Sequence, residues 1–270
     1  MSRLRYGALA EALWSLRAPV YFDEPTPTER AVRFRPARAR GIAPLYDVYL
    51  PRTTPRASAL LVHGGGFTLG SRTMVPMRFL ASRLVRSGIA VACTDYRMIF
   101  RGGRIDEAVG DVHDALEHFR AHGERRHGLD PARLGMVGLS AGGTLAMLVA
   151  ASAPVHRLAC AFGLYELDHL EGGLASIVPR LLFRSPDRSL WHARSPRHAP
   201  QPSAPTLLLH GTADGLVPVR QAEALAAHRR ALGLPTSLVV YPGAPHGFFQ
   251  RDCPEAHAGA DAIAAHLTSA

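Results

Sequence analysis

Residues 134–146, LGMVGLSAGGTLA, are the stretch that decides the fold of this chain. The first residues are an apolar run that predicts a buried strand over 134–138, and the Ala- and Leu-rich residues predict a helix over 141–153. Between them lies the pattern GLSAG, which predicts a turn so sharp that Ser140 is held in strained backbone geometry. Side chains at the two glycine positions of that pattern would collide with neighbouring elements.

Ser140 would stand at the amino end of the helix, beside the unpaired N–H of Ala141, where the helix dipole favours negative charge. A serine nucleophile held above the edge of a sheet requires this context. The five-letter pattern is loose, so a glycine-rich turn whose serine caps the helix remains an open reading of this stretch alone.

Short apolar runs and amphipathic segments alternate outward from this turn. The apolar runs predict further strands at residues 58–62, 88–93, 158–162, 206–209 and 237–241. Apolar residues at helical spacing predict helices at residues 76–85, 105–122, 219–231 and 255–267. Crossover connections are needed to return the chain to the same sheet edge, so the alternation predicts an α/β fold with a doubly wound, mostly parallel sheet.

The length of 270 residues predicts a single domain spanning 1–270. Residues 1–43 and about 164–205 fall outside the alternation of strands and helices. Ligands of such sheets bind beyond the carboxyl ends of the strands, so these segments are possible parts of a small cap.

The composition excludes several other classes of protein. All 31 basic residues are Arg, spread along the chain, which favours coding bias over a patch that binds nucleic acid as the cause of the net charge of +9. Three widely spaced cysteines predict neither a disulfide framework nor a zinc site. Because we find neither a run of ~20 apolar residues nor a secretory signal, we expect a cytoplasmic protein without a membrane partner.

A serine hydroxyl needs a base and an acid to become a nucleophile, and candidates for both follow later strands. Asp214 lies in HGTADGLVP after residues 206–209, and His246 lies in PGAPHGFF after residues 237–241. The chain order Ser140, Asp214, His246 is the order found in hydrolases with this type of turn. All three side chains would lie at the same carboxyl edge of the sheet.

Other roles for these residues compete with catalysis. Asp214 could form an Asx turn, and His246 could be a surface-loop histidine, since the chain contains 14 His. His210 is the nearest competitor for the base, but it follows its strand directly and should pack within the sheet layer. His118 and His122 are four residues apart and could hold a metal, but no third ligand is spaced to join them, so a solvated helix face is favoured.

The glycine-rich stretch HGGG at residues 63–66 follows the first predicted strand. Acyl transfer generates an oxyanion, and fixed backbone N–H donors at its position lower the barrier by roughly 3–4 kcal/mol each. Gly65, Gly66 and Ala141 are the predicted donors. Alone, HGGG could equally be a phosphate-binding turn or a plain loop.

Together these motifs resemble the α/β-hydrolase fold, and within it the hormone-sensitive-lipase-like and BD-FAE-like carboxylesterases. The resemblance covers about Tyr46 to His266 and includes the DYR triplet at 95–97 and GLDPAR at 128–133. It implies a catalytic triad, with Ser140 as nucleophile, His246 as base and then acid, and Asp214 as its orienting group. The implied oxyanion hole consists of Gly65, Gly66 and Ala141.

Two departures from the common family pattern bear on the substrate. Leu139 precedes the nucleophile where many relatives carry an acidic residue or His, and residues 98–101 read MIFR where Leu-Ala-Pro-Glu is usual. These residues help to shape the pocket wall in the family, so the substrate of any one relative does not transfer.

The resemblance implies a serine carboxylesterase that acts through an acyl-enzyme on Ser140. The chain is short for this fold, so any cap is small, and a small cap favours short-chain or small aromatic esters. It implies no metal and no organic cofactor, and the expected partner is a small-molecule ester. An aryl formamidase or amidase of the same fold, and a non-catalytic α/β-hydrolase scaffold, are the alternatives. The sequence does not indicate the oligomeric state.

Overall fold

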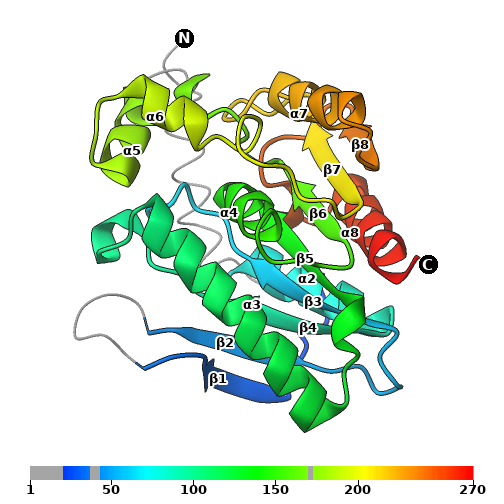
Figure 1. Ribbon diagram of the computed structural model, residues 1–270. Coiled ribbons are helices and arrows are strands. Elements are labelled where there is room, and N and C mark those ends of the chain that lie inside the picture. The colour runs from blue at the N-terminus through cyan, green and yellow to red at the C-terminus, as the bar shows by residue number, and fades with distance from the viewer. Residues whose placement is uncertain (1–20, 37–42, 170–172, 270) are drawn as a thin grey trace.

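The apolar runs of the sequence form the parallel strands of one sheet. The computed structural model describes residues 21–36, 43–169 and 173–269. Its parallel strands are β3 (Ala57–Val62), β4 (Ile89–Thr94), β5 (Leu134–Leu139), β6 (Leu158–Ala161), β7 (Thr206–Gly211) and β8 (Thr236–Tyr241). Every residue of β3 to β7 is buried, as expected for strands covered on both faces. The predicted doubly wound α/β fold is confirmed (Figure 1).

Two antiparallel strands that the sequence analysis did not predict extend the sheet at one edge. They are β1 (Glu29–Arg33) and β2 (Leu45–Tyr49), and the strand order is β1-β2-β4-β3-β5-β6-β7-β8. An acidic residue interrupts the apolar pattern of β2: Asp47 is buried, accepts a hydrogen bond from the Ala31 N–H at 2.7 Å and pairs with Arg72 at 3.0 Å.

These strands show that part of the segment expected to form a cap belongs to the sheet instead. Residues 29–33 fall within the expected cap segment 1–43, but they form a strand at the edge of the sheet. Tyr21, in the same segment, donates a hydrogen bond to the Phe249 carbonyl at 2.7 Å and stacks near Phe79, against the core. Residues 1–20 and 37–42 of that segment lie outside the described residues.

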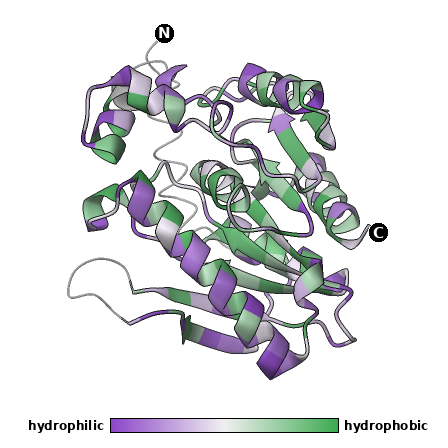
Figure 2. Cartoon of the chain, viewed as in Figure 1, coloured by the Kyte–Doolittle hydropathy of each residue, from purple (hydrophilic) through white to green (hydrophobic). Residues whose placement is uncertain are grey.

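Helices cover both faces of the sheet and divide the core into two layers. The helices α3 (Ile105–His127), α4 (Ala141–Ala150) and α7 (Arg220–Ala231) pack on one face, and α2 (Val75–Arg86) and α8 (Pro254–Thr268) pack on the other. Figure 2 shows the central strands as hydrophobic and α3 as a mixture of hydrophobic and hydrophilic patches, which fits a helix with one buried face. No helix in the described parts of the chain is long and apolar enough to cross a membrane.

The connection between β6 and β7 contains two helices, α5 (Gly173–Phe183) and α6 (Arg188–Ala193), which lie apart from the sheet beyond α4 (Figure 1). Trp191 of α6 is buried, and its indole N–H donates to the Ser185 carbonyl at 3.0 Å. The buried hydroxyl of Ser195 donates to the Trp191 carbonyl at 2.8 Å. Local packing and hydrogen bonds therefore order this connection, which lies within the expected cap segment 164–205.

A buried carboxylate joins α3 to the loop after β4. Asp111 is 1% exposed and accepts hydrogen bonds from the Arg97 side chain at 2.7 and 2.8 Å and from the Arg97 N–H at 2.8 Å. Arg35 reaches the same carboxylate at 2.6 Å. Arg97 is the last residue of the DYR triplet, so this motif acts here as a structural tie.

We expect Asp111→Asn to lower the free energy of unfolding by about 3–5 kcal/mol, because it leaves two guanidinium groups in or near the core without their counter-charge. Urea denaturation followed by circular dichroism measures the loss. Asp114→Asn is the matched control: Asp114 lies on the same helix and pairs with Arg35 at 3.6 Å, but its side chain is 46% exposed, so the change should stay below about 1 kcal/mol. Equal losses in both variants would contradict this assignment.

Candidate active site

The turn between β5 and α4 has the strained geometry that the GLSAG pattern predicted. Ser140 has φ 52° and ψ −120°, a conformation that residues with a side chain rarely adopt. A Cβ on Gly142 would lie 2.2 Å from the Val62 carbonyl oxygen, and one on Gly138 would lie 2.3 Å from the Gly142 oxygen. Only glycine fits at both positions, so the sequence fixes Ser140 at the carboxyl end of β5.

The structure brings Ser140, His246 and Asp214 together from three different strands. His246 follows β8, and its Nε2 lies 3.0 Å from the Ser140 Oγ. Asp214 follows β7, and its Oδ2 lies 2.7 Å from the His246 Nδ1. The three side chains are therefore within hydrogen-bonding distance in the order hydroxyl, imidazole, carboxylate.

The Asp214 carboxylate is buried but well provided with donors. Its Oδ1 accepts hydrogen bonds from the Leu216 N–H at 2.9 Å and the Val217 N–H at 2.8 Å. Burial alone would raise the pKa of Asp214, but hydrogen bonds from His210 and His246 outweigh it and hold the pKa well below its usual range. Asp214 is therefore ionised at neutral pH. It requires a proton on Nδ1 of His246, which leaves Nε2 free to accept the Ser140 proton.

Two residues contact this group that sequence reasoning did not assign to it. His210 is fully buried within the sheet layer, as expected, but its Nε2 also lies 3.1 Å from the Asp214 Oδ2 and 2.9 Å from the Val217 oxygen. Both neighbours are acceptors, so Nε2 carries the proton. Phe162, at the end of β6, places its ring 5.1 Å from the His246 ring in an edge-on contact. Both residues lie at the carboxyl ends of predicted strands. This position is the one feature of the sequence that could have assigned them to the site.

The glycine-rich loop after β3 lies against the Ser140 turn. A Cβ on Gly64 would lie 3.0 Å from both the Leu139 carbonyl oxygen and the Ser140 Cβ. Gly65 has φ 114°, and a Cβ there would lie 1.9 Å from the Leu69 oxygen. Glycine at 64 therefore lets this loop lie close to the Ser140 turn, whereas glycine at 65 lets the glycine-rich loop fold back on its own residue Leu69.

The amides of Gly65, Gly66 and Ala141 lie on these two loops. Among the described residues, none of the three donates a hydrogen bond to a main-chain carbonyl of a turn or loop. The preceding residue, His63, is fully buried, stacks on Tyr96 with 4.3 Å between ring centroids and bonds the Gly64 oxygen through Nδ1 at 2.7 Å. The contacts of His63 therefore fix the start of the loop.

The histidine pair on α3 is arranged differently from the sequence expectation. His118 bonds Tyr46 through Nδ1 at 2.8 Å, while Nε2 of His122 lies 3.2 Å from a Glu29 carboxylate oxygen, and His127 reaches the same carboxylate. The cluster around Glu29 contains His122 but not His118. The expectation that this face of the helix is solvated is wrong, because both side chains are half-buried. The reason is that β1 brings Glu29 beside α3. This cluster is distant from Ser140 in the strand order.

Two family models match the two halves of this arrangement. The BD-FAE model matches residues 46–172, which include the glycine-rich loop and Ser140. The model described as the prolyl oligopeptidase family matches residues 182–261, which include Asp214 and His246. Together the two matches support an α/β-hydrolase esterase family for this chain. The sequence resemblance to this fold and family is confirmed, and the order of strands and loops in this α/β-hydrolase agrees with it.

Curated relatives match this α/β-hydrolase over parts of their length. It is 29% identical over 228 residues to a probable isoprenylcysteine alpha-carbonyl methylesterase of Oryza sativa subsp. japonica, covering 74% of this chain and 54% of that protein. It is 36% identical over 108 residues to an arylacetamide deacetylase of Oryctolagus cuniculus, covering 38% of this chain and 27% of that protein. The chain thus spans about half the length of the methylesterase.

Solved structures match over nearly the whole of both chains. An inhibited esterase B from Lactobacillus rhamnosis has a TM-score of 0.80 at 20% identity, with 98% of this chain and 93% of that chain covered. Carboxyl esterase 2 from Tuber melanosporum has a TM-score of 0.75 at 20% identity, with 99% and 97% covered. At these identities the likeness shows a shared fold.

We expect Gly142→Ala to destabilise this α/β-hydrolase by about 3 kcal/mol, because the added methyl group meets a fixed backbone oxygen and cannot turn away. Gly110→Ala is the control: a Cβ at Gly110 meets no atom within 4 Å, and alanine should stabilise α3 by about 1 kcal/mol. Thermal denaturation of the two variants measures the difference. A Gly142→Ala protein as stable as the wild type would refute the close approach.

Proposed function

We propose that this chain is a serine carboxylesterase in which Ser140 is the nucleophile, His246 the general base and acid, and Asp214 the residue that orients His246. The observation that carries the proposal is the continuous line of contacts from the Ser140 Oγ through His246 to Asp214, at 3.0 and 2.7 Å. A serine hydroxyl aimed at a neutral imidazole that is itself held by a carboxylate is suited to acyl transfer.

In the first half of the reaction, His246 accepts the Ser140 proton while the Oγ attacks the ester carbonyl carbon. The carbonyl oxygen takes the negative charge and accepts hydrogen bonds from the amides of Gly65, Gly66 and Ala141. Collapse of this intermediate breaks the bond to the alcohol oxygen, to which His246 returns the proton. The products are the free alcohol and an acyl ester on Ser140.

In the second half, water replaces the alcohol. His246 takes a proton from the water as it attacks the acyl carbon, and it then returns the proton to the Ser140 Oγ as the carboxylic acid leaves. Asp214 stays ionised throughout, because four donors surround its oxygens, and its charge stabilises the imidazolium that forms twice in each turnover. All of this chemistry is performed by residues of the chain.

Short-chain or small aromatic esters are the substrates that we propose. The names of several similar proteins refer to small acyl or alkyl groups: a methylesterase, an arylacetamide deacetylase, an acetyl ester-xyloside hydrolase and a propionate-bound esterase. Helices α5 and α6 are short, so a cap formed by the 164–205 connection within one domain would cover only a small pocket. A cytoplasmic location and the absence of a nucleic-acid partner remain predictions from the sequence.

Amide hydrolysis is the second candidate. The match to the prolyl oligopeptidase family covers the residues that hold Asp214 and His246, which favours a site able to cleave a C–N bond. Aryl formamides are the small substrates of this type. Comparing kcat/KM for 4-nitrophenyl acetate with kcat/KM for N-formylkynurenine distinguishes the two, and a higher value for the formamide would replace the ester proposal.

We expect Ser140→Ala to lower esterase turnover by at least about 10⁴-fold, because the variant lacks the nucleophile. A fluorophosphonate probe should label the wild type at Ser140 and leave the variant unlabelled, with unchanged circular dichroism as the control for folding. A wild type that neither hydrolyses 4-nitrophenyl acetate nor reacts with the probe would favour the alternative of a non-catalytic scaffold.

Asp214→Asn should lower kcat by up to about 10⁴-fold while leaving KM and the fold largely unchanged. The amide can donate where the carboxylate accepts, so His246 is driven to the tautomer that presents a proton rather than a lone pair to Ser140. Steady-state kinetics with 4-nitrophenyl esters separates kcat from KM. A rise in KM alone would indicate that Asp214 shapes the pocket instead.

A further inference from the structure

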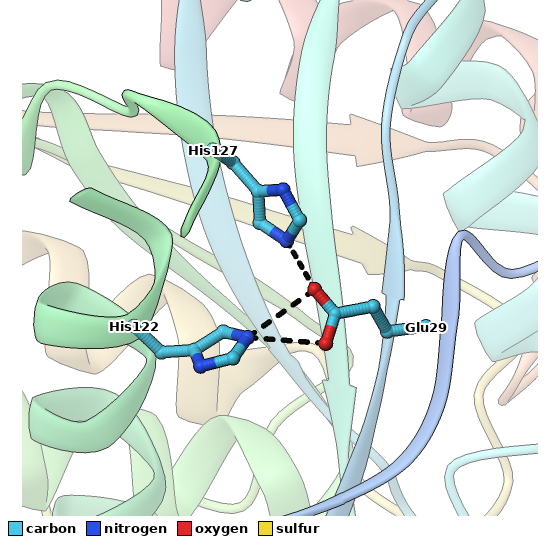
Figure 3. A group of neighbouring side chains, drawn as sticks. All are labelled: Glu29, His122 and His127. Atoms are coloured by element: carbon cyan, nitrogen blue, oxygen red, sulfur yellow. Dashed lines mark hydrogen bonds and ion pairs between the residues drawn. The ribbon is translucent and has the colours of Figure 1, made fainter. Parts of the chain in front are cut away.

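One cluster of metal-ligating side chains lies outside the site described above. Glu29 of β1 faces His122 and His127 from the last turns of α3, and the three side chains converge on one point (Figure 3). The Nε2 of His122 lies 3.2 and 3.3 Å from the two Glu29 carboxylate oxygens, and the Nε2 of His127 lies 2.5 Å from one of them. These side chains are only 11–24% exposed, so the solvent around them is limited.

The contact of His127 with Glu29 is also close. Its Nε2 is buried and lies 2.5 Å from a Glu29 oxygen, a distance suited to an ion pair when the imidazole is protonated, but it makes no hydrogen bond of good geometry among the described residues. When the imidazole is neutral, its lone pair can instead bind a cation together with the carboxylate.

We propose that Glu29, His122 and His127 bind a divalent transition metal ion of the zinc class. The ligand atoms lie within 4.8 Å of one another. Zinc bonds of about 2.0–2.1 Å in a tetrahedron separate neighbouring ligand atoms by about 3.3 Å, so His122 and Glu29 already have the required spacing. His127 would need to move outward by about 1 Å.

The donor set selects the type of ion. Two imidazole nitrogens and one carboxylate suit zinc, cobalt, nickel or copper, whereas magnesium and calcium prefer oxygen ligands alone. Three protein ligands leave one position of the tetrahedron for water. His118 is not among the converging ligand atoms, and its Nδ1 bonds the Tyr46 hydroxyl at 2.8 Å.

The position of the site indicates a structural role. Glu29 and His122 are 93 residues apart in sequence, and Glu29 begins the outermost strand of the sheet, which pairs only with β2. His127 is the last residue of α3, whose end is fixed by Gly128 at φ 64°. A metal ion bound here would tie the free edge of the sheet to the helix that covers it.

The test uses the full chain stripped of metal with EDTA and titrated with zinc chloride by isothermal calorimetry. We expect one site with a Kd of about 10 μM or lower, and at least a tenfold weaker Kd in His127→Ala and in Glu29→Gln. The control is His113→Ala, because His113 lies on the same helix with a 43% exposed side chain and is not part of the cluster. Its Kd should equal that of the wild type.

A second readout is thermal stability. Zinc at 100 times its Kd should raise Tm by about 5 °C in the wild type and in His113→Ala, and leave Tm of His127→Ala unchanged. Glu29→Gln keeps the size of the side chain and its hydrogen-bonding oxygen, so it answers the question if His127→Ala does not fold.

Three results would overturn the proposal. The first is the absence of zinc binding by the wild type at zinc concentrations up to about 1 mM, which corresponds to a Kd too weak for a specific site. The second is a wild-type Kd in both His127→Ala and Glu29→Gln. The third is loss of binding in His192→Ala, which would place the ion at the exposed group where His192 lies 2.9 Å from Asp168 and stacks on His198.

Discussion

The close approach of Gly142 to the Val62 carbonyl oxygen is the contact on which the proposed active site, at the carboxyl edge of the sheet, depends. Val62 ends β3, and Gly138 is its partner at the end of the pairing between β3 and β5, so the two chain segments leave the sheet as neighbours. The first turn of α4 then passes over the Val62 oxygen with no room for a Cβ. This contact sets the position of the Ser140 hydroxyl and, at the same time, its distance from the glycine-rich loop. The proposed nucleophile and the proposed oxyanion site are thereby built as one rigid unit.

The other half of the site is held by polar contacts rather than by steric fit. β8 is an edge strand with partly exposed residues, so packing alone would leave the loop that carries His246 loosely held. Asp214 restrains this loop through its hydrogen bond with His246. Two backbone N–H groups and His210 fix the position of the Asp214 carboxylate independently of His246. Phe162 makes an edge-on contact with the imidazole ring. The proposed base, His246, is therefore oriented by a buried carboxylate that is fully hydrogen-bonded, which is the arrangement in which a buried charge is least costly.

The features that sequence predicted best are those with a local cause. An apolar run, a glycine pair around a serine and a helical stripe are each determined by residues close in the chain, so β5, α4 and the placement of Ser140 followed directly. β2 was missed because Asp47 is satisfied by Ala31 and Arg72, which lie 16 and more residues away. The end of α3 was placed at 122 rather than His127, and this error hid the second histidine of the Glu29 cluster. Contacts between distant segments leave no periodic pattern in the sequence. For the same reason, the position of His210 in the sequence did not indicate its contact with Asp214.

The proposed active site, at the carboxyl ends of the central strands, and the proposed metal site, at the outer strand β1, serve different physical requirements. Four strand spacings, about 19 Å, lie between β1 and β5, so an ion at Glu29 cannot act on a reaction at Ser140 through direct contact or short-range electrostatics. At β1 the demand is to protect an exposed edge, since unpaired strand groups invite pairing with other chains. A ligand set shared between the edge strand and its covering helix meets that demand without any residue of the proposed active site. Because a metal that binds only the folded chain stabilises it by mass action, stability rather than turnover is the property through which this site would act.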